Sequence, residues 1–87
     1  MSVLLVVDRA EGGAGIWAMV WTTEEADPRL LESRHFRGEA ALKVWLAGIA
    51  IKYGRENIQV NWSDALKADE RLTVLLEESV GGDIARG

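Results

Sequence analysis

Three segments in the first half of the chain carry the hydrophobic patterns of β-strands. Residues 3–7 are apolar without interruption, which predicts a strand covered on both faces. Residues 16–22 alternate between two sets of apolar side chains, so one set should face each side of a sheet. The first set is Ile16, Ala18 and Val20, and the second set is Trp17, Met19 and Trp21. Residues 30–36 include Glu32, Arg34 and His35. Because charges protect exposed sheet edges, we expect this strand at an edge.

The clearest helical pattern follows these strands, and it is unusually apolar. The helix should begin at Gly38-Glu39, run to about Tyr53 and end at Gly54. One stripe at helical spacing consists of Leu42, Trp45, Leu46, Ile49 and Tyr53. A second stripe consists of Val44, Gly48 and Ile51. Together the stripes offer more apolar surface than one sheet face needs. Either a second layer of the fold covers this helix, or the second stripe binds a protein partner or a second copy of the chain.

The last third of the chain adds a strand and a helical region. Residues 57–62 alternate between apolar and polar positions and predict a fourth strand. Ser63 or Asp64 should cap the helical region, in which a short first turn can give way to a second start at Asp69. Gly81 and Gly82 should end it, and residues 83–87 are expected to form a flexible tail of a single domain, residues 1–87.

Chain direction places three acids at one edge of the expected sheet. Asp8 ends the first strand, Glu39 opens the helix and Asp64 follows the fourth strand. If the fourth strand pairs with the first, the strand order is 3-2-1-4, and Asp8 and Asp64 lie about one strand spacing apart, ~5 Å. If it pairs with the third strand, they lie ~14 Å apart, too far to share a metal. The apolar first strand and the charged third strand favour the order 3-2-1-4.

The expected fold is therefore of the α/β (α+β) class, with the element order βββαβα, a mixed four-stranded sheet and two helices. This order resembles the first part of the ribonuclease H-like fold, in a truncated form. The resemblance covers about residues 2–70, with local echoes in Val6-Val7-Asp8, Arg37-Gly38-Glu39 and Trp62-Ser63-Asp64. The chain departs from that family because it has no fifth strand and no firm counterpart of a fourth acid.

In the ribonuclease H-like family, acids at these positions hold two magnesium ions that cleave a phosphodiester. The resemblance thus implies that Asp8, Glu39 and Asp64 are metal ligands. Carboxylate oxygens suit hard cations, and two such ions can stabilise both the attacking and the leaving oxygen.

The composition and net charge of the chain exclude or disfavour several classes of function. The 87 residues include 14 acidic and 10 basic side chains, and the net charge of −4 argues against a dedicated nucleic-acid binder. The absence of cysteine excludes disulfides, thiolate zinc sites and cysteine nucleophiles. No segment approaches the ~18–20 apolar residues of a membrane span, so we expect a soluble, cytoplasmic protein.

The tryptophans are expected to stabilise the hydrophobic core and not to bind a ligand. The periods of the four tryptophans match core faces, and we place Trp17, Trp21, Trp45 and Trp62 in the core. The lone histidine, His35, is expected to be a surface residue, because it has neither a second histidine nor a paired nucleophile.

Two functional hypotheses follow from these patterns. The first is a small acidic, non-catalytic protein-interaction module, such as an inhibitor or regulator of a larger enzyme, that needs no cofactor. The alternative is a magnesium-dependent ribonuclease H-like nuclease that uses Asp8, Glu39 and Asp64. If the second helical stripe pairs two copies, Val44→Glu should convert a dimer to a monomer.

Overall fold

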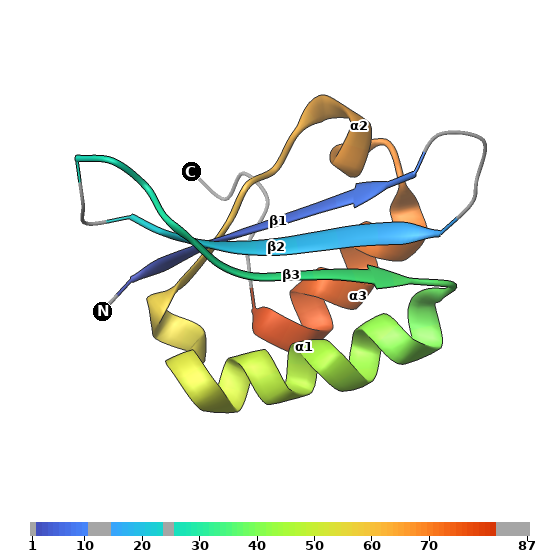
Figure 1. Ribbon diagram of the computed structural model, residues 1–87. Helices are drawn as coiled ribbons and strands as arrows, with labels where there is room; N and C mark the ends of the chain where they lie inside the picture. Colours follow the sequence, from blue (N-terminus) through green and yellow to red (C-terminus); the bar gives the residue numbers. More distant parts are fainter. Residues whose placement is uncertain (1, 11–14, 24–25, 82–87) are drawn as a thin grey trace.

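The computed structural model describes residues 2–10, 15–23 and 26–81, and its centre is a mixed four-stranded sheet (Figure 1). The strands are β1 (Val3–Arg9), β2 (Ile16–Thr22), β3 (Leu30–Phe36) and β4 (Ile58–Val60). Their order is β3-β2-β1-β4. β1 runs antiparallel to β2 and parallel to β4. The predicted α+β class and the 3-2-1-4 order are confirmed.

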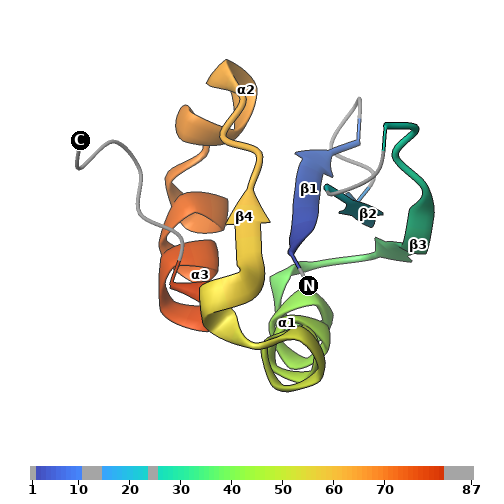
Figure 2. The same cartoon turned by 90° about the vertical axis from the view of Figure 1, so that its left-hand side faces the viewer.

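Helices lie mainly on one side of this sheet, as two perpendicular views show (Figures 1 and 2). They are α1 (Glu39–Tyr53), α2 (Asp64–Lys67) and α3 (Glu70–Val80), and a 3₁₀ turn, η2 (Arg55–Asn57), precedes β4. Gly54 ends α1 as predicted, because its φ of 86° lies in a region that favours glycine, while its N–H donates to the carbonyl of Ala50.

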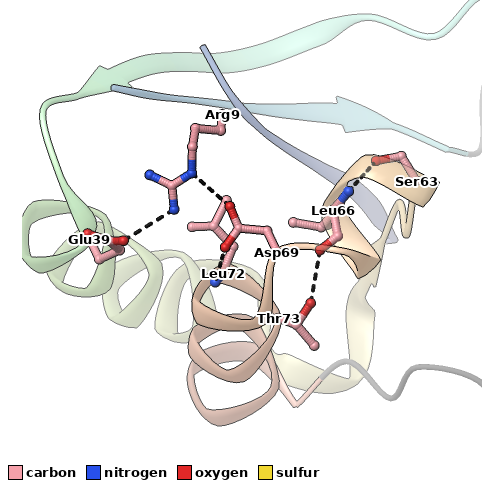
Figure 3. A network of polar contacts seen from close by, with 7 residues as sticks. All are labelled: Arg9, Glu39, Ser63, Leu66, Asp69, Leu72 and Thr73. Carbon is pink, nitrogen blue, oxygen red and sulfur yellow. Dashed lines mark hydrogen bonds and ion pairs between the residues drawn. The ribbon is translucent and has the colours of Figure 1, made fainter. Parts of the chain in front are cut away.

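The helical region after β4 contains both of the starts that the sequence suggests. The Ser63 hydroxyl accepts a hydrogen bond of 3.1 Å from the N–H of Leu66 and caps α2. The Asp69 carboxylate accepts one of 3.2 Å from the N–H of Leu72 and caps α3 (Figure 3). The Thr73 hydroxyl donates to the carbonyl of Leu66, which ties the two short helices together. The expected helical region is thus divided into two helices at the second start that the sequence suggests.

The hydrophobic core lies between one sheet face, here called the covered face, and the helices α1 and α3. The sheet contributes the alternate residues Val3, Leu5, Val7, Ile16, Ala18, Val20 and Ile58. The two helices contribute Leu42, Leu46, Ile49, Leu72, Leu75, Leu76 and Val80. Removal of these side chains from water is the main favourable contribution to folding.

The opposite sheet face, here called the open face, corrects two expectations. β1 was expected to be covered on both faces, yet Leu4 and Val6 are only half-buried. Trp17 was expected in the core, yet 47% of it is exposed. The reason is that α1 and α3 both pack on the covered face. Trp45 and Trp62 do contact the core, although both are only partly buried.

The chain leaves the sheet earlier than expected after β4. The predicted strand at residues 57–62 spans only Ile58–Val60, and the N–H of Asn61 makes one further hydrogen bond to the carbonyl of Leu5. The predicted flexible tail, residues 83–87, lies outside the described residues. Within the described part of the chain, no helix has the length and apolar character needed to cross a membrane.

Candidate functional site

A cluster of ion pairs lies where β1 ends and where α1 and α3 begin. Arg9 is two residues beyond the buried Val7, so strand alternation places its side chain on the covered face. Its Nε donates to Asp69 Oδ2 at 2.7 Å, and its Nη2 donates to Glu39 Oε1 at 3.2 Å (Figure 3). One guanidinium therefore connects a strand end with the first turns of two helices.

These contacts keep both carboxylates ionised. The hydrogen bond from Arg9 lowers the pKa of Asp69, and the backbone N–H of Leu72 adds to this effect. The pKa of Glu39 is lowered by its own backbone N–H at the helix start and then by Arg9. The pKa of Arg9 is raised, because it donates to both acids. A carboxylate held in this way is a poor general acid, so the cluster is suited to stabilising the fold.

The structure does not bring the three predicted metal ligands together. Glu39 is engaged by Arg9 on the covered face. Asp8 alternates with the buried Val7 and pairs with Trp17, which places its exposed side chain on the open face. Asp64 is an exposed residue in the first turn of α2. Across residues 2–10, 15–23 and 26–81, no group of three His, Cys, Asp or Glu side chains could hold a metal ion. Metal binding stays a prediction that this geometry does not favour.

Arg9 is the residue of this edge that the sequence reasoning missed. The signal was present in the alternation of β1, because Val3, Leu5 and Val7 define a face that continues to residue 9 and not to residue 8. The acids at the starts of α1 and α3 are then the natural partners of a cation on that face.

The second apolar stripe of α1 lies on the molecular surface, as expected. Val44 is 75% exposed and Ile51 is 86% exposed. Gly48 lies between them, and a Cβ atom added to it would meet no other atom within 4 Å. We call Val44, Gly48 and Ile51 the α1 ridge. The ridge is accessible, and its predicted role in partner binding stays a prediction.

The open face of the sheet is a second apolar surface, on which Trp17 is 47% exposed. Cross-strand neighbours on β1 and β2 place Leu4 beside Trp21 and Val6 beside Met19. Trp17 follows on β2, and its ring centroid lies 4.6 Å from that of His35 on β3. His35 is exposed, as predicted. The large apolar side chains of the open face, namely Leu4, Val6, Trp17, Met19 and Trp21, therefore form a continuous band on β1 and β2.

The edge strand β3 carries a second polar cluster on the covered side. Glu32 Oε2 accepts hydrogen bonds from the Tyr53 hydroxyl at 2.8 Å and from Lys52 Nζ at 3.1 Å. Burial acts to raise the pKa of Glu32, but the two hydrogen bonds outweigh it and the pKa is lowered. Burial and the hydrogen bond to Glu32 together raise the pKa of Tyr53. Glu32 therefore anchors the edge strand to the last turn of α1.

Comparisons of this chain with protein-family models, with curated proteins and with solved structures found no match. The resemblance to the ribonuclease H-like fold stays a prediction that rests on element order. The function must accordingly be argued from the surfaces and clusters described above.

Proposed function

We propose that this domain is a non-catalytic protein-interaction module whose open face binds an apolar helical segment of a protein partner. The bound segment would form a second layer on the sheet, on the side where the described residues supply none. A regulator or inhibitor of a larger enzyme is one protein of this kind.

The main support for the proposal is that β1 has apolar residues on both faces of the sheet. Residues 3–7 are all apolar, and β1 pairs in parallel with β4. Strands of this kind are normally covered on both faces by helices. Here Val3, Leu5 and Val7 are buried, whereas Leu4 and Val6 are only half-buried. A helix from a partner would complete the arrangement that the β1 sequence favours.

The composition of the open face supports the same conclusion. Trp17, Met19 and Trp21 lie on one side of β2, and aromatic residues and methionine are enriched at the centres of protein interfaces. The α1 ridge consists of Val44 and Ile51 around a glycine, and it carries no aromatic side chain or methionine. We therefore assign the partner to the open face.

Charge indicates the character of the partner. The chain carries a net charge of −4, and Asp8 lies on the open face at the end of β1. A partner helix with basic residues beside its apolar stripe would be favoured, because opposite charges accelerate encounter and suppress wrong partners. No observation favours the nuclease alternative, since Glu39 is held by Arg9 and Asp8 lies on the opposite face of the sheet.

Photocrosslinking tests the proposal. A benzoylphenylalanine at position 17 should capture a partner protein in cells, whereas the same group at position 44, on the α1 ridge, should not. The captured protein is then purified and titrated by calorimetry. Trp17→Ala should weaken its binding by about tenfold or more, because exposed tryptophans are frequent interface hot spots. Val44→Ala is the matched control and should leave the affinity unchanged.

Two results would contradict this proposal. One is a partner that crosslinks from position 44 and not from position 17. The other is a purified partner that binds Trp17→Ala as tightly as the unmodified domain, when circular dichroism shows that both proteins are folded.

A further inference from the structure

The outer edge of β3 is an exposed strand edge of the sheet. β3 is the last strand in the order β3-β2-β1-β4, so within the described residues it pairs only with β2 (Figure 2). Ser33, Arg34 and His35 in its centre are all exposed. The backbone groups that point away from β2 can therefore accept another strand, which is how extended segments add to a sheet.

The sequence of β3 is complementary to itself in an antiparallel arrangement. If two copies of β3 meet with Ser33 opposite Ser33, Glu32 of each copy lies opposite Arg34 of the other. Directly opposed side chains in an antiparallel pair have Cβ atoms about 4.5–5.5 Å apart, within reach of an ion pair. The symmetric arrangement forms two such pairs, one on each side of the two-fold axis.

Glu32 is already positioned for this contact. The hydrogen bonds from Tyr53 and Lys52 both go to Glu32 Oε2. Glu32 Oε1 has no hydrogen-bond partner among the described residues, and the side chain is held in place by α1. Arg34 is exposed, and it forms no ion pair in the described part of the chain. A fixed acceptor and an available guanidinium therefore lie two residues apart on the same side of the strand.

The charges also select one register. A shift of the symmetric pairing by two residues in one direction places Arg34 opposite Arg34. A shift in the other direction places Glu32 opposite Glu32. Like charges directly opposed are destabilising, so the neighbouring registers are disfavoured while the central one gains two opposite-charge pairs. Glu32 and Arg34 thus disfavour the pairing of β3 with unrelated strands, but they allow β3 to pair with a second copy of itself.

We propose that two copies of this chain pair through antiparallel β3 strands to form one continuous eight-stranded sheet. The two-fold axis passes between the two opposed Ser33 residues and is perpendicular to the sheet. Both helical layers then lie on one side, and both open faces lie on the other. The pairing is confined to β3, because Arg29 and Arg37, which would face each other in a longer ladder, lie just beyond its ends. This proposal is independent of the identity of any partner on the open face.

A cysteine crosslink tests the geometry directly, because the chain has no cysteine of its own. Opposed residues in an antiparallel pair have Cα atoms about 4.5–5.5 Å apart, which a disulfide can span. Ser33→Cys should form a disulfide-linked dimer under mild oxidation. Ala65→Cys is the matched control, since Ala65 is exposed on α2, which follows the strand at the opposite edge of the sheet. It should form no disulfide-linked dimer in the same experiment.

Charge variants test the register by sedimentation equilibrium. Arg34→Glu places four acids at the interface and should raise the dimer dissociation constant by about tenfold or more. Lys67→Glu makes the same charge change at an exposed position of α2, beyond the opposite edge of the sheet, and should leave the constant nearly unchanged. An equimolar mixture of Arg34→Glu with Glu32→Arg should restore a dimer, because each variant then supplies the charge that the other lacks.

The outcomes are distinct. Equal crosslinking of Ser33→Cys and Ala65→Cys, or a monomeric mass for the unmodified protein at every concentration tested, would overturn the proposal. If Glu32→Arg fails to fold because it loses the contacts with Tyr53 and Lys52, the Ser33→Cys and Arg34→Glu results still decide the question.

Discussion

At the scale of single residues, Arg9 shows how much depends on one position along a strand. It bonds Asp69 and Glu39, which stand at the first turns of α3 and α1. The neighbouring Asp8 faces the other side of the sheet and takes no part. A difference of one position thus separates a side chain that joins three elements from one that faces solvent.

Acid titration should reveal the Arg9 cluster. The pKa values of Glu39 and Asp69 are lowered in the folded state, so their contribution to stability is present above their ordinary values of about 4 and is lost as the pH falls through the lower folded values. Arg9→Met should reduce the free energy of unfolding by about 0.5–1 kcal/mol at pH 7, the size expected for exposed ion pairs. The deficit should shrink as the pH falls below about 4 and through the lowered pKa values of the folded state.

Urea denaturation at a series of pH values measures this effect. Arg37→Met is the control, because Arg37 is exposed and forms no ion pair among the described residues. A deficit for Arg9→Met that stays constant from neutral pH until both carboxyl groups are protonated would show that the side chain acts by packing and not by charge.

Calorimetry with Mg²⁺ addresses the predicted metal ligands at the same scale. The unmodified protein and the double variant Asp8→Asn, Glu39→Gln should give the same heat on titration with Mg²⁺. The reason is that the two carboxylates lie on opposite faces of the sheet and Glu39 already pairs with Arg9. Saturable heat in the unmodified protein that the double variant lacks would contradict this expectation and revive the nuclease alternative.

At the scale of elements, most of the fold could be predicted because local patterns determine it. The alternation of residues 16–22 and the apolar stripe of α1 correspond to β2 and to the buried Leu42, Leu46 and Ile49. The start at Asp69 was visible as a capping residue. These features need no knowledge of distant parts of the chain.

The features that were mispredicted depend on the number of layers in the fold. An uninterrupted apolar strand and a tryptophan at a periodic position look the same whether a second layer of helices exists or not. Trp17 and the half-buried Leu4 were therefore assigned to a core that does not extend to the open face. The placement of Asp8 depends on a related point, because the edge of a sheet has two sides and only alternation tells which side Asp8 occupies.

The variant Val44→Glu distinguishes pairing through the α1 ridge from pairing through β3. Val44→Glu should change the free energy of unfolding by no more than about 0.5 kcal/mol, because Val44 is 75% exposed. If the ridge pairs two copies, sedimentation should show a dimer converted to a monomer. If β3 pairs them, the dimer should persist in Val44→Glu and weaken in Arg34→Glu.

At the scale of the whole molecule, the arrangement is a two-layer domain with an asymmetric surface. One sheet face is sealed by α1 and α3, the other carries exposed tryptophan, and the β3 edge of the sheet is open among the described residues. The proposed partner and the proposed second copy use different parts of this surface. Pairing through β3 would double the open face on one side and so allow two partner helices to bind one assembly.

The central position of β1 has a consequence for how the chain reaches this structure. β1, β2 and β3 can form a meander from contacts between neighbouring segments, but Val3 also pairs with Ile58, and the core extends to Val80. Closure between such distant segments is slow relative to hairpin formation. Pairing of β1 with β4, and not formation of the meander, should therefore limit the rate at which the chain folds.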